Sequence, residues 1–181
     1  FIFDDASADI RYNRIYGNVA DISGGGINIF AESARLTTIS NNKVFDNVSL
    51  NLRGPSLAPE KTRIAQMSEE PGGGICVWGG NTSIVNNMIY HNRSDGCGDG
   101  LGVISSGDGN AIVLNNTVAD NDPGNGEGVF MSSWGVEITF HNNLMVGHHT
   151  GVKATTDTLV NQNFNGYFDN VQNREMLMPG A

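Results

Sequence analysis

The chain has 181 residues, of which 24 are Gly and 23 are Asn, and its 10 Lys and Arg against 19 Asp and Glu give a formal net charge of -9. The clustered Gly and scarce Pro exclude collagen, while the apolar residues that recur throughout exclude a disordered acidic tail. Gly and Asn are poor helix formers and the charge is negative, which argues against a helical protein and against a nucleic-acid binder. These counts leave a folded, turn-rich β protein.

Two further features of the sequence concern membrane helices and the ends of the chain. No apolar run is long enough for a membrane helix, and the first residues do not resemble a signal peptide. The chain begins without Met and ends without a closing element, so we expect one domain over residues 1–181 that is a segment of a longer or processed protein.

A repeated unit runs along the chain: an apolar strand, an Asn pair, a short apolar strand and a further Asn. It reads YNRIYGN at 12–18, ISNNKVFDN at 39–47, IVNNMIYHN at 84–92, VLNNTVADN at 113–121, FHNNLM at 140–145 and VNQNF at 160–164. A glycine signature alternates with it: GGGI at 24–27 and 72–75, GLGV at 100–103, GEGV at 126–129 and GV at 151–152.

The spacing of the repeats predicts the architecture. The landmarks Asn13, Asn42, Asn87, Asn116 and Asn143 are 29, 45, 29 and 27 residues apart. The one long interval contains residues 50–71, which are rich in Pro and charge and which we interpret as an inserted loop. Three short strands and three turns per unit are typical of one coil of a parallel β-solenoid, so we expect an all-β protein of five or six coils.

The residue types suit such a coil. Asn tolerates a left-handed turn, and its amide can bond the same amide in the coils above and below. Gly before the next strand allows a tight corner. Two interior columns are then predicted: Ile27, Ile75, Val103, Val129 and Val152; and Ile15, Val44, Ile89, Val118 and Met145.

The alternation of GGGI with the Asn-pair motif resembles the right-handed parallel β-helix repeat family, which has the pectate-lyase-like superfold. The resemblance covers residues 10–170 and is nearest to bacterial secreted and surface proteins, including the polymorphic outer-membrane type. It implies a right-handed solenoid in an extracellular or cell-surface location, with outer-membrane association as one form of it. It does not imply an activity, because the fold carries lyases, hydrolases, epimerases and adhesins alike.

In the enzymes of that family the substrate groove follows the strand that the glycine signature opens. If Ile27, Ile75, Val103 and Val129 point inward, the alternation of a strand turns the next residues outward. The first outward set is Asn28, Cys76, Ile104, Phe130 and Lys153, and the second is Phe30, Trp78, Ser106 and Ser132.

Carboxylates of the neighbouring loops are the candidates for chemistry. Hard oxygen ligands suit Ca²⁺, for which the candidate residues are Asp95, Asp99, Asp120 and Asp122, although Asp in such turns usually bonds its own backbone. No cofactor is otherwise required. Acid and base roles in sugar cleavage need two nearby carboxyls, for which Asp95, Asp99, Asp122 and Glu127 are candidates with Lys153 as a base.

Other side chains point to ligand binding or to packing. Trp78 and Phe130 are candidates for an aromatic platform under sugar rings, with side packing as the alternative. Asn28 and Arg93 lie beside the same groove. We expect the adjacent His148 and His149 to be solvated in a turn. Cys76 and Cys97 fit either two packed thiols or one disulfide.

No complete catalytic set accompanies the repeat, so the sequence favours a secreted or surface module that binds a polysaccharide or cell-surface glycan, or displays a surface, without catalysis. The alternative is a polysaccharide lyase or glycoside hydrolase that uses the loop carboxylates, with or without Ca²⁺. A third hypothesis is an assembly unit, because solenoid ends expose strand edges that can stack end to end. Neither a nucleic-acid partner nor a membrane span is expected.

Overall fold

The computed structural model describes residues 2–3, 7–21, 23–31, 35–50, 72–96, 98–106, 109–122, 126–155 and 158–176. Within these ranges all regular structure is strand, and all strand pairing is parallel. No helix of the length and hydropathy that a membrane crossing needs occurs in this part of the chain. Of the predicted insertion at 50–71, residues 51–71 lie outside the described residues.

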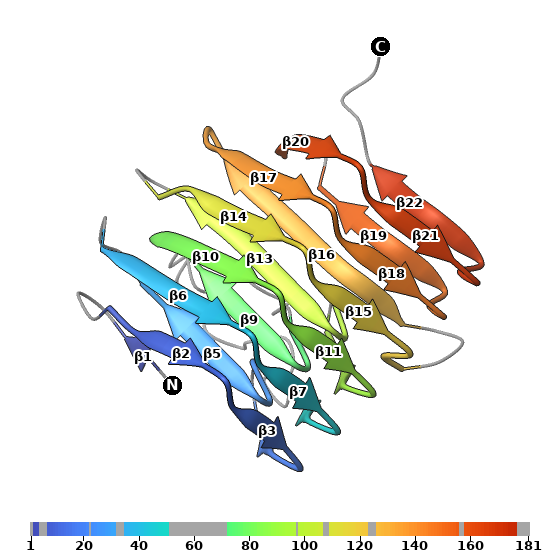
Figure 1. The fold of residues 1–181 in the computed structure, drawn as a ribbon, viewed down its shortest axis with the longest axis horizontal. Coiled ribbons are helices and arrows are strands. Elements are labelled where there is room, and N and C mark those ends of the chain that lie inside the picture. The colour runs from blue at the N-terminus through green and yellow to red at the C-terminus, as the bar shows by residue number, and fades with distance from the viewer. Residues whose placement is uncertain are drawn as a thin grey trace, which may run out of the picture.

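The strands form four parallel sheets that wind around one core (Figure 1). Sheet A has the order β1 (Ile2–Phe3), β5 (Ile27–Phe30), β9 (Ile75–Trp78), β13 (Leu101–Ser106), β16 (Glu127–Trp134), β19 (Thr150–Ala154), β22 (Gln172–Met176). Sheet B has the order β2 (Asp9–Arg11), β6 (Leu36–Ser40), β10 (Asn81–Val85), β14 (Ala111–Leu114), β17 (Glu137–His141), β20 (Leu159–Asn163).

Sheets C and D complete each turn of the chain. Sheet C contains β3 (Arg14–Tyr16), β7 (Lys43–Phe45), β11 (Met88–Tyr90), β15 (Thr117–Ala119), β18 (Leu144–Val146) and β21 (Gly166–Phe168). Sheet D contains only β4 (Val19–Ala20), β8 (Val48–Ser49) and β12 (Arg93–Ser94). A coil therefore passes from sheet B through C to A, and the first three coils insert a two-residue strand of sheet D. The predicted parallel β-helix is confirmed.

The register confirms one predicted column and corrects the other. Ile15, Val44, Ile89, Val118 and Met145 are stacked in sheet C as predicted. In sheet A, however, the residue between Ile75 and Val129 is Leu101, and Val103 stacks on Val77 and Met131 instead. The prediction for Val103 was therefore wrong by two residues, although Val103 does point inward.

The cause of this error is the choice of corner glycine in GLGV. A Cβ on Gly100 would lie 2.8 Å from the carbonyl oxygen of Gly128, so Gly100 occupies the close corner and β13 turns inward at the very next residue. The outward positions shift in the same way. Gly102 pairs with Cys76 and Phe130 in place of Ile104, and Ile104 pairs with Trp78 and Ser132 in place of Ser106.

The two residues of each Asn pair have different roles. The first residue adopts the left-handed backbone, with φ of 56° at Asn41, 58° at Asn86 and 55° at both Asn115 and Asn142. The second residue belongs to a ladder of amides that runs through Asn13, Asn42, Asn87, Asn116, Asn143 and Asn165, and its four interior members are buried.

Every interior rung of this ladder is saturated. The Oδ1 of Asn116 accepts the backbone N–H of Asn87 at 2.9 Å and its Nδ2–H at 3.0 Å. The Nδ2 of Asn116 in turn donates to Asn143 Oδ1 at 3.0 Å and to the Ile84 carbonyl at 2.9 Å. Because all its donors and acceptors are used, the amide is buried without an unpaired polar group, and it locks the axial register of neighbouring coils.

We expect Asn116→Ala to destabilise the fold by about 3 kcal/mol, because it leaves two buried donors of Asn87 and one buried carbonyl without partners. Urea unfolding measures the change. Asn110→Ala is the matched control, because Asn110 is exposed and donates its backbone N–H, which the variant keeps, to Asn81 Oδ1. This variant should lower the free energy of unfolding by no more than about 0.5 kcal/mol. Equal losses of unfolding free energy in the two variants would contradict a stabilising role of the buried amides.

Candidate functional site

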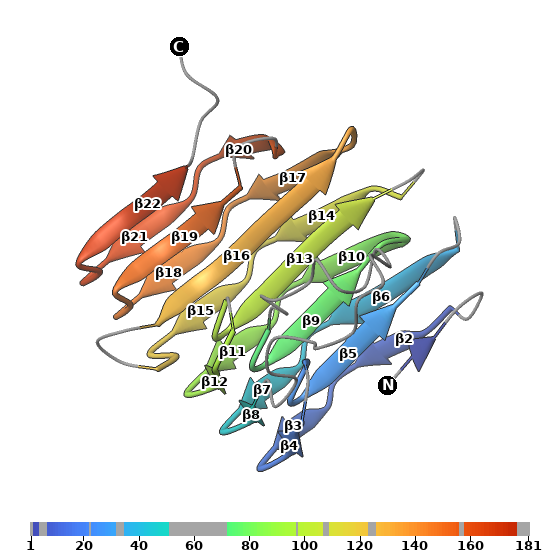
Figure 2. The same ribbon diagram turned by 180° about the vertical axis from the view of Figure 1, so that it is seen from behind.

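The outer face of sheet A carries four of the predicted site residues, Asn28, Trp78, Phe130 and Lys153, and Figure 2 views the molecule from this side. The register places Asn28, Cys76, Gly102, Phe130 and Lys153 in one row across the strands. The adjacent row contains Phe30, Trp78, Ile104 and Ser132. The loops that enter these strands bring Asp99 and Glu127 to the same edge.

Asp99 is a structural anchor of this edge. Its Oδ1 accepts the Ser94 N–H at 2.7 Å, and its Oδ2 accepts the Glu127 N–H at 2.8 Å. The residue is only 4% exposed. The carboxylate therefore joins two neighbouring coils, and both of its oxygens are engaged with backbone amides of the protein itself.

Burial raises the pKa of Asp99 to about 6, even though the hydrogen bonds from Ser94 and Glu127 act in the opposite direction. The negative charges of Asp122 and Glu127 raise this pKa further. Asp99 thus changes its charge between mildly acidic and neutral pH, while it stays enclosed in the wall of the solenoid.

Glu127 and Lys153 form an ion pair beside Asp99. The Nζ of Lys153 lies 2.6 Å from Oε1 of Glu127, and the two side chains are 25% and 18% exposed. The other oxygen, Oε2, accepts the Gly98 N–H at 3.3 Å. The structure therefore brings four candidate residues to one place, Asp99, Asp122, Glu127 and Lys153, and two of them neutralise each other.

The other predicted polar residues lie apart from this group. Arg93 pairs with Asp95 at 3.1 Å on the surface, where both side chains are more than 40% exposed. Asp120 occupies a left-handed turn position with φ of 47°. Among the described residues, no three His, Cys, Asp or Glu side chains come together in a group able to hold a metal ion. The Ca²⁺ site remains a prediction.

Of the two aromatic candidates, Phe130 is buried and Trp78 is partly exposed. Phe130 is 4% exposed and packs with Ile104 against Trp78, as the packing alternative predicts. Trp78 itself stacks on Phe30, with ring centroids 5.8 Å apart, and meets Trp134 edge to face at 6.2 Å. Trp134, which no repeat motif singles out in the sequence, is 56% exposed. We call Phe30, Trp78 and Trp134 the aromatic row.

The two remaining groove residues serve the local structure. Asn28 donates from Nδ2 to the carbonyl and hydroxyl oxygens of Ser23, at 3.2 and 3.0 Å, and so closes the turn before β5. Cys76 is fully buried, and Cys97 lies outside the described residues.

His148 belongs to a second amide ladder, which corrects the prediction that it is solvated. This ladder runs through Asn18, Asn47, Asn92 and Asn121, and His148 takes the next rung before Asn170. His148 is 2% exposed, whereas His149 is exposed. Its place was readable in the spacing, because each ladder residue follows the second Asn of a pair by five positions, and Asn143 is five before His148.

The neighbours of His148 determine its tautomer. Its Nε2 lies 3.2 Å from Nδ2 and 3.4 Å from the backbone N of Asn121, which are both donors, so Nε2 accepts and Nδ1 carries the proton. Nδ1 is buried without a hydrogen-bond partner in the described structure. Burial lowers the pKa of His148 below its usual value of 6.5, and nearby Asn170 and Asp120 only partly offset this effect.

The comparison with known families agrees with this geometry. Residues 5–165 match the family described as right handed beta helix region. The chain has no detectable match among curated proteins or among solved structures. The match spans nearly all of the repeats, and it concerns the scaffold rather than an activity.

We expect His148→Asn to stabilise the protein by about 1 kcal/mol at neutral pH, because an amide restores the rung and removes the unpaired Nδ1–H. The site should fit Asn, since Gly100 packs on Asn121 as Gly128 packs on His148. The lowered pKa means that wild-type stability is lost as pH falls below 6.5, so the advantage of the variant should grow toward pH 5. Thermal unfolding at several pH values measures it, with His149→Asn as the unaffected control. An advantage that shrinks toward acid pH would contradict the assignment.

We expect Asp99 to give the opposite pH dependence. Because its pKa is raised from 3.8 to about 6, the wild-type protein should lose on the order of 2–3 kcal/mol as pH rises from 4 through 6. Asp99→Asn should be less stable overall, since its NH₂ faces a backbone N–H, but it should lack this pH-dependent loss. Urea unfolding between pH 4 and 7 compares the two, and the exposed Asp95→Asn is the control. Parallel curves for wild type and Asp99→Asn would refute the raised pKa.

Proposed function

The chain belongs to the right-handed β-helix family, and on this scaffold we propose that it is a glycan-binding module without catalytic activity, displayed outside the cell or on its surface. The observation that carries the proposal is the aromatic row on the outer face of sheet A. The extracellular location is supported by the resemblance of the repeats to secreted and surface proteins of this fold.

The aromatic row is suited to sugar rings. Phe30 and Trp78 lie nearly parallel, with 16° between their planes, and Trp134 stands at 71° to Trp78. The row crosses from β5 to β16, and its centroid distances of 5.8 and 6.2 Å keep the two end rings within about 12 Å of each other. A chain of sugars that runs along the solenoid axis would meet an apolar surface with one exposed indole at its end.

Hydroxyl groups stand next to this row. The Oγ of Ser132 lies 3.1 Å from Oγ1 of Thr155, which lies 2.7 Å from Oγ1 of Thr158. Ser132 pairs with Ile104, the neighbour of Trp78, so the hydroxyls adjoin the aromatic row. Aromatic faces beside hydroxyl donors and acceptors are the combination that sugar recognition requires.

The state of the carboxylates supports binding over turnover. Hydrolysis with two acids needs one carboxyl to protonate the leaving group and a second to act on the other side of the sugar. Here Asp99 has both oxygens on backbone amides within the wall, and Glu127 is paired with Lys153. The lyase or hydrolase alternative would need these groups to leave their partners before they met a substrate.

We expect Trp134→Ala to weaken binding of the preferred polysaccharide by roughly tenfold or more, because it removes the exposed indole, without a change in the fold. Affinity electrophoresis over a polysaccharide panel, run with and without Ca²⁺, selects the ligand, and calorimetry measures the loss. Phe168→Ala is the matched control, since Phe168 is 69% exposed on sheet C.

The same panel tests the absence of catalysis. No new reducing ends and no unsaturated products should form in it. Equal binding by Trp134→Ala and wild type would overturn the role of the aromatic row, and product release would overturn the non-catalytic part of the proposal.

A further inference from the structure

The Asn ladders have a direction. At every step from Asn to Asn, the Asn of one coil donates its backbone N–H and an Nδ2–H to the Oδ1 of the following coil, as Asn116 does to Asn143 at 3.0 Å for each bond. The ladder therefore points its acceptors toward the N-terminal coil and its donors toward the C-terminal coil. The last rung must present donors.

Asn165 is the last rung of the first ladder. Its Oδ1 accepts both bonds from Asn143, at 2.9 and 3.2 Å, and one Nδ2–H goes to the Phe140 carbonyl at 2.8 Å. Among the described residues, no acceptor meets its backbone N–H or its second Nδ2–H. Two amide donors are thus directed out of the C-terminal end of the described solenoid.

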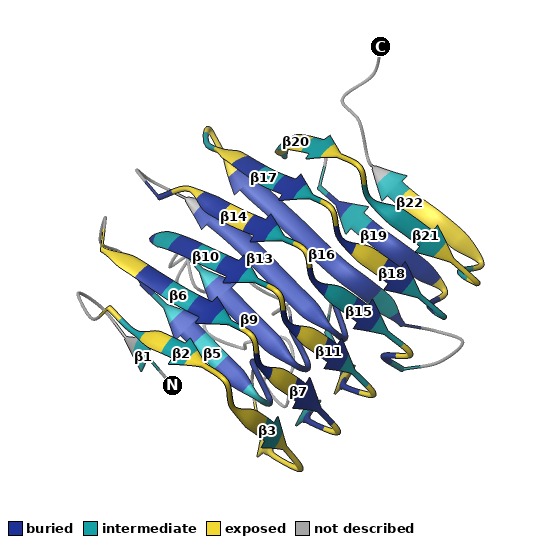
Figure 3. Cartoon of the chain, viewed as in Figure 1, coloured by how far each residue is buried: buried dark blue, intermediate teal, exposed yellow. Residues whose placement is uncertain are grey.

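The interior of the same coil changes from apolar to polar. The register places Gln162 on Phe140, Tyr167 on Met145 and Arg174 on Val152, so three inward positions that are aliphatic or aromatic in the preceding coil carry polar groups here. Figure 3 shows the burial falling off in this last coil. Arg174 therefore takes an interior position that is apolar in the preceding coil, and no carboxylate of the described residues forms an ion pair with its guanidinium.

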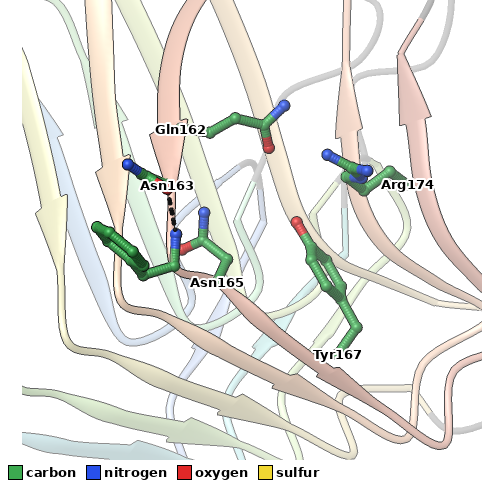
Figure 4. Close-up of a pocket in the computed structure, with 6 residues that line it drawn as sticks. Gln162, Asn163, Asn165, Tyr167 and Arg174 are labelled. Carbon is green, nitrogen blue, oxygen red and sulfur yellow. Dashed lines mark hydrogen bonds between the residues drawn. The ribbon is translucent and has the colours of Figure 1, made fainter.

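These residues surround an open depression of about 340 Å³, at the lower end of the size range of ligand pockets. Its lining consists of Gln162, Asn163, Phe164, Asn165, Tyr167 and Arg174. Figure 4 shows the Tyr167 phenol pointing into the space between Gln162 and Arg174.

The lining combines a cation with hydrogen-bond donors. The guanidinium carbon of Arg174 lies 5.8 Å from the centre of the Tyr167 ring, and the Tyr167 hydroxyl is buried without a hydrogen-bond partner in the described structure. Burial raises the pKa of Tyr167, so the hydroxyl keeps its proton and can donate. No carboxylate lines the depression, and Glu175 pairs in register with Lys153 on the opposite face of sheet A.

We propose that this C-terminal depression binds a small molecule that bears a carboxylate, which Arg174 pairs with and which the Asn165 amide and the Tyr167 hydroxyl bind as donors. A planar carboxylate can take two N–H groups of a guanidinium and still accept further bonds. The Asn163 side chain, which accepts only the Phe164 N–H, is placed to bond hydroxyls of a sugar acid. The site lies apart from the aromatic row and does not depend on the proposed glycan function.

The test titrates the whole chain at low ionic strength with sodium acetate, D-glucuronate and D-glucose, and follows the amide and side-chain NMR signals. Both carboxylates should shift the Asn165 backbone amide and the Arg174 side chain, and glucose should not. Tighter binding of glucuronate than of acetate would identify a sugar acid as the ligand, and equal affinities would identify a simple organic acid. Equal shifts with glucose would overturn the proposal.

Two variants and a control give the test its specificity. Arg174→Gln should weaken carboxylate binding roughly tenfold or more, because it removes the charged partner. Arg14→Gln removes the same charge from β3 in the first coil and should leave binding unchanged. Tyr167→Phe, which deletes only the hydroxyl, should weaken binding by a smaller factor. Binding that survives Arg174→Gln, or that Arg14→Gln weakens equally, would refute the site.

Discussion

The saturated amide ladder is the interaction on which the remaining structure depends. A buried amide costs free energy unless its acceptor and both donor hydrogens are bonded, and an identical amide one coil away satisfies all of them together with a backbone carbonyl of the neighbouring coil. Asn87, Asn116 and Asn143 meet this condition at 2.9–3.2 Å. A shift of one coil by a single residue would break every bond of the rung, so the ladder sets the register of sheets B and C.

That register decides which side chains face outward on sheet A and which loop residues meet. The same demand for satisfied polar groups accounts for the partners of the acidic residues beside sheet A. Asp99 accepts hydrogen bonds from backbone amides of two coils, and Glu127 forms an ion pair with Lys153. On the outer face of sheet A the register leaves a row of partly or largely exposed aromatic rings with hydroxyls beside it, and the proposed glycan contact rests on this row.

Sequence reasoning was most reliable where one interaction repeats. The sheet C column followed from the Asn spacing because the ladder and the column share a register. The sheet A column failed at Val103, since GLGV offers two corner glycines and only the close approach of Gly100 to Gly128 distinguishes them. The place of His148 in the second ladder was not predicted, because this position has His where the other coils have Asn, although it still follows the second Asn of a pair by five residues. The burial of Asp99 and the exposure of Trp134 depend on contacts between coils, which no local pattern contains.

A ladder that donates in one direction also makes the two ends of the solenoid chemically different. The first coil presents the Oδ1 acceptors of Asn13 and Asn18 next to the apolar Ile10 and Ile15, and the last presents amide donors next to Arg174. Amide donors and acceptors would be complementary in an end-to-end stack, but the interiors would not, because Arg174 would face aliphatic side chains. Among the described residues, the last coil therefore differs from the first in two ways, because its ladder presents donors and its interior positions carry polar side chains.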